Sequence, residues 1–347
     1  MYNIPVLFII FNRKETASQA FQRIRQAKPA RLYVAQDGPR GDNADDEAKI
    51  RDTRQAIINA IDWECEVKTL FQNTNLGCCM GVYTAISWLF ENDEMGIVIE
   101  DDCVADDTFF AFAEEMLMKY KDDQRIGMIA GTNPIMQYTP RCSYLFSRFK
   151  SCWGWATWRR AWNNMDLNMQ WRETDLRNVI NNSGFNGKHN SKWYAQLKCI
   201  DNGAVSSWDW PWYFSLAAQN QLCIYPACNL VSNVGNGADA THTSLASVTY
   251  KATPLSFPLV HPPHGQFAGE DGVLCASHRR GSASLLRVSL PVEDFAAFQP
   301  AESRSDHPDH CGWIPGLRTA LHPGLPRHGK DLLFHRQPIS KKCVVVI

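Results

Sequence analysis

The chain lacks long hydrophobic runs and an excess of charge of either sign. No stretch approaches the roughly 20 consecutive apolar residues that a membrane-spanning helix requires. The apolar run 4–11 is too short for a secretory signal and has no cleavage-like end. Lys and Arg number 35 against 36 Asp and Glu, so the formal net charge is −1. Composition therefore favours neither nucleic acid nor an anionic membrane as a partner, and 347 residues suffice for one large α/β domain or two smaller ones.

Motifs of several common enzyme classes are also missing. The 12 cysteines include no Cys-x-x-Cys pair, so we expect free thiols in a reducing cytosol rather than a disulfide framework. Neither a G-x-x-x-x-G-K-[ST] phosphate loop nor a G-x-S-x-G elbow occurs, which disfavours P-loop NTPases and α/β-hydrolases. Residues 235–240 match G-x-G-x-x-A, but the acidic partner expected about 20 residues further on is absent. We therefore do not interpret them as a dinucleotide site.

The most informative stretch that is present is 97–102. An Ile-Val-Ile run typical of a strand buried on both faces is followed directly by Glu100, Asp101 and Asp102. In an open α/β sheet, ligands bind at the carboxyl ends of the strands. Three adjacent carboxylates repel one another, and oxygen ligands suit a hard cation such as Mg2+ or Mn2+ shared with a substrate phosphate. A solvated acidic turn after a strand is the alternative.

Strand and helix patterns alternate at short intervals around this stretch, which favours βαβ units and a mostly parallel sheet. We expect strands at 4–10, 31–36, 66–71, 97–99, 126–130 and 222–226. We expect helices at 16–27, 44–62, 78–90, 108–120 and from about 212 to 218, with partly helical structure in 166–205. The predicted fold class is therefore α/β, with a mostly parallel central sheet flanked by helices.

Polar residues follow three of the predicted parallel strands. Asn12 and Arg13 follow the first strand, Asp37 the second, and the acidic triplet the fourth. Because the carboxyl ends of parallel strands open on one edge of a sheet, these residues should converge on one site. The alternatives for Arg13 and Asp37 are a charge at a helix start and an acid in a turn.

Residues 153–162 hold four Trp and two Arg within ten positions. The rings can pack a loop against the sheet. Alternatively, Trp153, Trp155 and Trp158 can stack on the apolar faces of sugar rings while Arg159 binds phosphate. Both interpretations fit the sequence.

Two later residues are candidates for chemistry. Asp209 lies between two Trp just before a predicted helix, where desolvation would raise the pKa of its carboxyl and make it a usable general base. The alternative is a helix N-cap, with Pro211 in the first turn. His242, flanked by two Thr, is either a metal ligand or a surface side chain.

The composition changes near residue 261. Eight of the ten His and nine of the 18 Pro lie in 261–347, mixed with Gly, Ser and Arg and without a sustained helix or strand period. We predict a folded domain over 1–260 and an irregular, poorly ordered extension over 261–347. The abrupt change would also suit a shifted reading frame or a fusion.

The first 260 residues resemble glycosyltransferases of the GT-A fold, specifically a bacterial family-2-like group of nucleotide-diphospho-sugar transferases that includes hemolysin HlpA-like members. The stretches that carry this resemblance are Val6–Arg13, Gln36–Gly38, Asn75–Gly77, Ile99–Cys103, Trp153–Trp162, Asn229–Gly235 and Thr241–Thr243. The resemblance implies a GT-A domain with a site at the sheet edge.

The resemblance also implies residue roles. The nucleotide would be bound by Phe11, Asn12, Arg13, Asp37, Asn75, Gly77, Glu100 and Asp101. Asp102 would be the direct metal ligand, with His242 completing the metal site, and Asp209 would be the base that deprotonates the acceptor hydroxyl. Trp153, Trp155, Trp158 and Arg159 would line the donor and acceptor pocket.

The function implied is a metal-dependent transfer of a sugar, with Mn2+ or Mg2+, from a nucleotide-sugar donor to a glycan or glycolipid acceptor. Inversion at the anomeric carbon, a role in cell-envelope polysaccharide or lipopolysaccharide synthesis, and a cytoplasmic location, with peripheral association at the inner face of the membrane, rest on the resemblance alone. The alternatives are an inactive transferase-like protein, a sugar-nucleotide-binding or hemolysin-like protein, and a sugar-nucleotide pyrophosphorylase. The last is disfavoured because residues 8–16 contain no Gly for a phosphate loop.

Overall fold

The computed structural model describes residues 2–133, 142–184, 190–203, 206–235 and 251–262, and the backbone of 273–274. The first part of the chain alternates strands and helices as the periodicity predicts. Its elements are β1 (Val6–Ile10), α1 (Lys14–Ala27), β2 (Arg31–Gln36), α2 (Asp46–Asn59), β3 (Glu66–Phe71), α3 (Gly77–Asn92), β4 (Met95–Glu100), β5 (Cys103–Ala105), α4 (Asp107–Lys119) and β6 (Ile126–Ala130).

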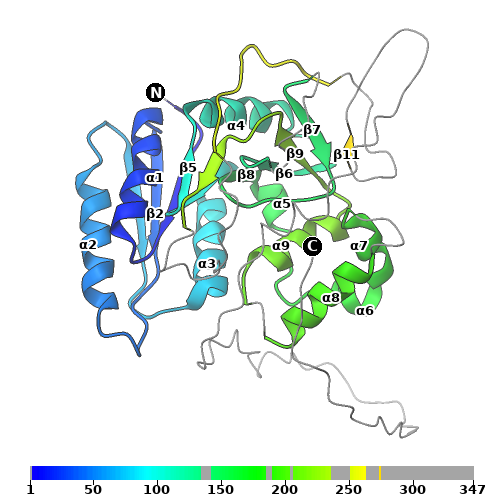
Figure 1. Ribbon diagram of the computed structural model, residues 1–347, viewed down its shortest axis with the longest axis horizontal. Coiled ribbons are helices and arrows are strands. Elements are labelled where there is room, and N and C mark those ends of the chain that lie inside the picture. Colours follow the sequence, from blue (N-terminus) through cyan, green and yellow to red (C-terminus); the bar gives the residue numbers. More distant parts are fainter. Residues whose placement is uncertain are drawn as a thin grey trace, which may run out of the picture.

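The second part is less regular and contains short helices. Its elements are β7 (Tyr144–Ser147), β8 (Trp155–Trp158), α5 (Arg159–Trp162), α6 (Trp171–Thr174), α7 (Leu176–Asn182), α8 (Asn190–Asp201), α9 (Asp209–Ala218), β9 (Leu222–Pro226), β10 (Val231–Asn233) and β11 (Val273–Leu274). In the view of Figure 1, α6 to α9 gather below β6, β7 and β9.

One nine-stranded sheet runs through the molecule in the order β11-β7-β9-β6-β8-β4-β1-β2-β3. The pairs β4·β1, β1·β2 and β2·β3 are parallel, and so is β6·β9. β8 is antiparallel to both β4 and β6, and β7 is antiparallel to both β9 and β11. Within the described residues, only β7 and β8 therefore oppose the common direction. The predicted α/β class with a mostly parallel central sheet flanked by helices is confirmed.

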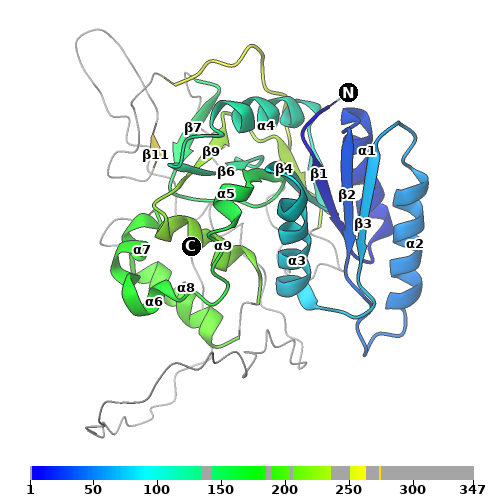
Figure 2. The ribbon, with the colours of Figure 1, turned by 180° about the vertical axis from the view of Figure 1, so that it is seen from behind.

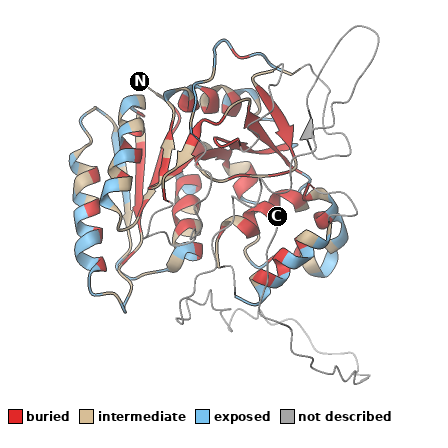
Figure 3. Ribbon diagram, in the orientation of Figure 1, coloured by how far each residue is buried: buried red, intermediate tan, exposed pale blue. Residues whose placement is uncertain are grey.

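The sheet is covered on both faces because its strands alternate between them. In β1, for example, Leu7 belongs to the core cluster that includes residues of α3 and of α5 to α9, whereas Phe8 belongs to the cluster that includes residues of α1, α2 and α4. Figures 1 and 2 show these two layers from opposite sides. Every side chain of α9 from Trp210 to Ala217 is buried, whereas α2 is largely exposed on its outer side (Figure 3). The helix that carries Asp209 is therefore held inside the fold.

A second, two-stranded sheet lies directly after the acidic triplet. β5 pairs antiparallel with β10, with Cys103 opposite Asn233. This pairing brings a segment from late in the chain beside the end of β4. It was not predicted, because strands of three residues leave too little periodicity to detect.

Residues 251–262 continue the fold beyond the second sheet. Thr253 N–H donates to Asn229 O over 2.8 Å, and Leu255 N–H donates to Thr108 Oγ1 over 3.0 Å. His261 lies 3.2 Å from Glu115 and 3.1 Å from the Tyr144 hydroxyl. These contacts fix the segment against α4 and β7.

The predicted division near residue 260 lies close to the end of this segment, and most of the predicted extension lies outside the described residues. Val273 and Leu274 are the exception, because their backbone pairs antiparallel with Ser147 and Phe146 of β7. The sheet therefore includes two residues of the stretch that was predicted to be irregular. The cysteines of the described part form no disulfide, as expected for free thiols.

Candidate active site

The acidic triplet lies at the carboxyl end of β4, where the predicted convergence of loops occurs. Asp101 is buried, and its Oδ2 accepts a hydrogen bond of 3.2 Å from the Phe11 backbone N–H after β1. Arg13 Nη2 contacts Asp101 Oδ1 and lies 3.0 Å from Asp102 Oδ2. The loop after β1 and the turn after β4 are therefore joined through one guanidinium.

This guanidinium offsets part of the repulsion among the acids. Desolvation raises the pKa of Asp101 to about 6, although Arg13 acts in the opposite direction. The two carboxylates raise the pKa of Arg13 above its usual value despite its own burial. Arg13 is thus the cation that contacts the acidic triplet and, as the N-cap residue of α1, it also lies at a helix start.

Glu100 connects the triplet to α9. Desolvation, together with the charges of Asp102, Asp101 and Asp209, raises the pKa of Glu100 to about 8. Because the Asp209 charge acts on Glu100, the first residue of α9 lies near the end of β4. The structure therefore brings two predicted site residues, separated by more than 100 positions, to the same edge.

Asp209 itself is the first residue of α9, and Trp208 occupies the cap position without a side-chain cap bond. The alternative of an Asp209 N-cap is therefore wrong, although Pro211 does lie in the first turn. Asp209 also raises the pKa of the Cys152 thiol, after desolvation as the largest cause. The carboxyl of Asp209 thus faces the interior between α9, Cys152 and the end of β4.

Asp102 is covered by the segment that follows β10. Asn233 Nδ2 donates to Asp102 Oδ1 over 3.3 Å, and Val234 N–H donates to the Asp102 carbonyl oxygen over 2.9 Å. A Cβ added at Gly235 would lie 2.3 Å from Asp102 Oδ2 and 3.1 Å from Arg13 Nη1. Only glycine therefore allows the backbone to approach the carboxylate this closely. Sequence reasoning assigned Gly235 no role in the site.

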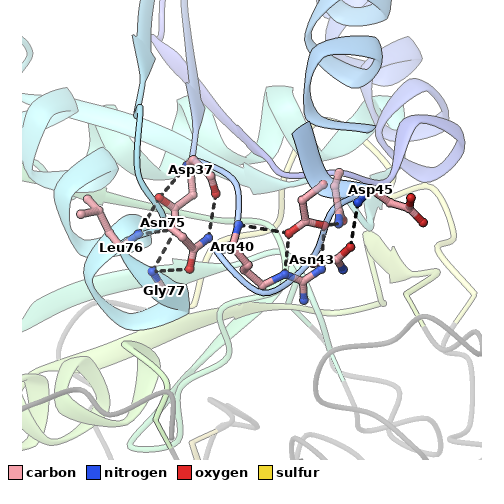
Figure 4. A network of polar contacts seen from close by, with 10 residues as sticks. Asp37, Arg40, Asn43, Asp45, Asn75, Leu76 and Gly77 are labelled. Carbon is pink, nitrogen blue, oxygen red and sulfur yellow. Dashed lines mark hydrogen bonds and ion pairs between the residues drawn. The ribbon is translucent and has the colours of Figure 1, made fainter. Parts of the chain in front are cut away.

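Asp37 joins the loop after β2 to the start of α3 (Figure 4). Its carboxylate accepts hydrogen bonds from the backbone N–H groups of Gly38, Leu76 and Gly77 over 2.9 to 3.0 Å. Desolvation raises its pKa, and these amides oppose the shift. Asn75 completes the bracket by donating to Gly38 O over 2.8 Å and accepting from Gly77 N–H over 3.1 Å. All three predicted nucleotide-binding positions here have structural bonds of their own.

A second group of polar contacts surrounds Asp46 and includes Arg40, which Figure 4 labels. Asp46 is fully buried and accepts hydrogen bonds from Asn12 Nδ2 over 2.8 Å and from Arg40 Nε and Nη2 over 2.6 and 2.8 Å. Arg40 also lies over the Phe11 ring, with 5.3 Å to the centroid. Sequence reasoning missed Arg40 and Asp46, because an Arg and an Asp six positions apart in a polar loop are not distinctive.

The predicted sugar-stacking role of the Trp-rich stretch requires correction at two positions. Trp158 is buried on the sheet face opposite Trp155 and donates to Leu117 O over 3.1 Å, so it packs in the core. Arg159 Nε donates to Phe90 O over 2.5 Å. The packing interpretation therefore holds for Trp158 and Arg159, since both are held by backbone carbonyls away from the acidic triplet.

Trp155 and Trp153 lie nearer the site. Trp155 follows the loop that contains Cys152 and stacks on Trp208 at 5.5 Å between ring centroids. It is fully buried, so a sugar could stack on its ring only after the surroundings move. Trp153 is half-buried, and its carbonyl oxygen accepts from Thr132 Oγ1 over 2.7 Å.

The residues present fit a metal only in part. No group of three or more His, Cys, Asp or Glu in the described residues could hold an ion by itself. Both carboxylates already have partners, Asp101 in Arg13 and Phe11 and Asp102 in Arg13 and Asn233, but Asp101 exposes 5 % of its side chain and Asp102 exposes 17 %. Mg2+ is commonly bound through one or two carboxylates together with substrate phosphates. The donor set therefore fits a hard cation held jointly by Asp102 and a diphosphate, and His242 lies outside the described residues.

Comparisons with known proteins give similarity in structure alone. No family model matches the chain, and no curated protein matches its sequence. Membership of the hemolysin HlpA-like group thus receives no support. Among solved structures, a mannosyltransferase from Pyrobaculum calidifontis in complex with GDP-Man and Mn2+ matches with a TM-score of 0.35 and 12 % identity, over 62 % of this chain and 69 % of that one.

Two further structures are similar to a comparable degree. The galactosyltransferase LgtC, in complex with donor and acceptor sugar analogues, has a TM-score of 0.30 and 12 % identity, over 49 % of this chain and 64 % of that one. A cytidylyltransferase from Leptospira borgpetersenii has a TM-score of 0.31 and 12 % identity, over 52 % and 71 %. Similarity at this level assigns no activity, so the function is argued from the residues of the site.

Among the helices of the described part, none is both long enough and apolar enough to cross a membrane.

Proposed function

We propose that the protein is a glycosyltransferase of the GT-A type, which moves a sugar from a nucleotide-diphosphate donor to a hydroxyl acceptor. One observation carries the proposal: the acidic triplet ends a parallel strand at the sheet edge, and the Asp209 charge acts on it from α9. A cation-binding carboxylate and a candidate base therefore share one edge. In a metal-dependent transfer by direct displacement, the ion neutralises the leaving diphosphate and the base takes the proton of the acceptor hydroxyl.

The donor side is formed by the loops after the parallel strands. Phe11, Arg13 and Asp101 fix one another, and Asn12 is fixed through Asp46. We assign this side to the nucleoside and its diphosphate. Asp37, Asn75 and Gly77 support the end of the site that we assign to the nucleobase. They do so through the backbone, since their polar atoms already bind one another and Gly38.

Asp102 is the proposed ligand of Mn2+ or Mg2+, because it is the least buried carboxylate of the pair that Arg13 bridges. When bound, the ion supplies charge neutralisation at the leaving diphosphate. His242 is proposed as a further ligand. Gly235 and Ala252 precede and follow His242 in the sequence. Gly235 lies beside Asp102, and Ala252 N–H donates to Ser232 Oγ over 2.7 Å.

Asp209 is the proposed general base. Its carboxylate would take the proton of the acceptor hydroxyl while the acceptor oxygen bonds to the anomeric carbon and the bond from that carbon to the diphosphate breaks. The nucleoside diphosphate would leave with the bonding electrons. A single displacement of this kind inverts the anomeric centre. Inversion, the cell-envelope context and a cytoplasmic site at the inner face of the membrane follow from the resemblance and belong to the proposal.

Calorimetric binding of UDP, GDP and CMP, with and without Mn2+, tests the proposal on wild type and Asp102→Ala. We expect diphosphate binding that requires the metal and is lost in the variant, whereas Asp122→Ala, an exposed acid after α4, should bind as wild type does. Binding that ignores both the metal and Asp102 would contradict the assignment of the triplet. Metal-dependent binding without sugar transfer would instead favour an inactive, nucleotide-sugar-binding protein.

A further inference from the structure

The interior between β7, β9 and α9 contains buried polar atoms without hydrogen-bond partners. Lys150 Nζ, Trp155 Nε1, Trp210 Nε1, Trp212 Nε1 and the Tyr225 hydroxyl are each buried and make no hydrogen bond within the described residues. Buried polar groups in folded proteins are normally hydrogen bonded, and an unpaired one costs about 1–3 kcal/mol. Such a concentration requires an explanation.

Lys150 is the most costly member of this group. The charges that act on its pKa are the Cys223 thiol and the like-charged Arg148 guanidinium, and no carboxylate is among them. Its ammonium lies 4.6 Å from the centre of the Tyr213 ring, which is its contact in place of an anion. Desolvation lowers the pKa of Lys150 to about 7. Among the residues that the structure describes, Lys150 therefore has no carboxylate as a counter-ion.

The unpaired atoms are mainly donors. An ammonium and an indole N–H can donate but cannot accept, and a phenol can donate. A ligand that satisfied them would therefore be rich in acceptor oxygens and would carry negative charge beside Lys150. If Lys150 only filled space in the core, an aliphatic side chain would do so equally well and would avoid the cost of desolvating an ammonium.

Neighbouring groups link Lys150 to the proposed base. Tyr213, which Lys150 contacts, and Cys152, two positions after Lys150, are both among the groups that raise the pKa of Tyr225, after desolvation as the largest cause. Cys152 in turn is close enough to Asp209 and Glu100 for their charges to act on it. Lys150 and its neighbours Tyr213, Tyr225 and Cys152 therefore lie close to Asp209, on the same face of the sheet.

We propose that Lys150 and the donors around it bind an acidic acceptor, a sugar that carries a carboxylate or a phosphate, and hold it beside Asp209. The assignment rests on the proposed function, since it places the acceptor next to the base of that reaction. The acid group pairs with the Lys150 ammonium, and the ring lies against the aromatic side chains of α9 after these buried surroundings have moved to admit it. The Tyr225 hydroxyl donates to an acceptor oxygen.

The test is calorimetric titration of glucuronic acid, glucose 6-phosphate and glucose at matched ionic strength, in the presence of Mn2+ and the nucleotide that binds. The full-length wild type is compared with Lys150→Met, Lys150→Arg and the surface control Lys49→Met. We expect one of the acidic sugars to bind wild type and Lys49→Met, to bind Lys150→Arg within about threefold, and to bind Lys150→Met at least tenfold more weakly. Neutral glucose should not distinguish the four proteins. The carboxylate and the phosphate are separate arms, so the result names the acid group.

Equal binding of the acidic sugars to wild type and Lys150→Met would overturn the proposal, and so would no binding by folded wild type. Lys150→Arg keeps the charge, which separates a lost contact from a misfolded variant. Metal-dependent nucleotide binding is measured on the same samples and should not change in Lys150→Met. If nucleotide binds and the acidic sugars do not, the acceptor assignment alone fails. If no nucleotide binds, the proposed function fails as well.

Discussion

Residues 2–133 and residues 150–225 differ in how many of their buried polar side chains have hydrogen-bond partners. In the first region, Gln36 donates to Phe11 O and Ile50 O, Asp46 is held by Asn12 and Arg40, and Asp93 accepts from the Tyr33 hydroxyl over 2.6 Å. Of the buried side-chain N and O atoms without a hydrogen bond in the described chain, all lie in the second region. The buried polar side chains of 2–133, the first half, thus have hydrogen-bond partners within the protein, whereas several of those in 150–225, the second half, do not.

The difference indicates a division of labour. A rigid, fully bonded half can present a fixed surface to a ligand without reorganisation, which suits the charged and invariant part of a nucleotide donor. A half with unused donors gains most when a ligand supplies acceptors, which suits the acceptor whose identity sets specificity. The predictions below test this division, from the largest expected effect to the smallest.

Asp209→Asn should separate the two halves most sharply. Removal of a general base lowers the rate typically by about 10²–10⁴-fold, while donor binding should stay within about twofold of wild type because the parallel half is untouched. Asp122→Asn serves as the control. Measured transfer rates and nucleotide affinities that fall together would contradict the division.

Asp46→Ala should show how much the hydrogen bonds of a buried carboxylate in residues 2–133 contribute to the free energy of unfolding. Loss of this fully buried carboxylate removes the acceptor of Arg40 Nε and Nη2 and of Asn12 Nδ2, and breaking a buried pair costs about 3 kcal/mol or more of unfolding free energy. Because Arg40 is partly exposed, we expect the lower end of that range, about 3 kcal/mol. Urea unfolding measures it. The exposed Arg25–Asp62 pair supplies the control, and Asp62→Ala should change little.

Lys150→Met should change how stability depends on pH. The pKa of Lys150 in the folded chain is lowered to about 7, against about 10.4 in an unfolded chain. Between these values the unfolded chain binds more protons, so stability rises with pH. For wild type we expect a contribution on the order of 2 kcal/mol between pH 6 and pH 9, which disappears in Lys150→Met.

Thermal or urea unfolding at the two pH values measures this contribution, and Lys49→Met should keep the wild-type slope. An unchanged slope in Lys150→Met would mean that the ammonium is better compensated than its contacts indicate.

Asp37→Ala should have the smallest effect. It removes the acceptor of three backbone N–H groups, those of Leu76 and Gly77 at the start of α3 and that of Gly38 after β2, and loss of a comparable cap costs about 1 kcal/mol. If Asp37, Asn75 and Gly77 only support the backbone near the nucleobase, nucleotide affinity should fall less than tenfold in calorimetry. A much larger loss of affinity with unchanged stability would instead indicate direct contact between Asp37 and the nucleotide.

The sequence predicts the first half well because its signals are local. β-Branched runs of five or six residues and helices of about 14 residues repeat their apolar positions often enough to be recognised. The predicted helix 16–27 is found as Lys14–Ala27, and the predicted strand 31–36 is found as β2. The convergence of Arg13 with the acidic triplet followed from the parallel order of the strands.

The second half is predicted less well because its structure depends on distant contacts. β7 and β8 have four residues each. They join the sheet by pairing with β9 and β4, which are distant from them in the sequence. The aromatic residues of β8 gave two interpretations, since a buried ring and a ring that stacks on a sugar have the same sequence. The role of Gly235 could not be predicted, because it depends on the position of Asp102 rather than on its own neighbours.

The pairing of β5 with β10 also fixes when the site can be completed during synthesis. The loops after β1, β2 and β4 are synthesised within roughly the first 110 residues, and a domain generally folds as a unit once its elements are present. Asp102, however, gains Asn233 and Gly235 only after a further stretch of more than 120 residues is made. A nascent or truncated chain that ends before this point would therefore expose an uncovered acidic edge, and production of shortened forms should keep residue 235 and the strand that precedes it.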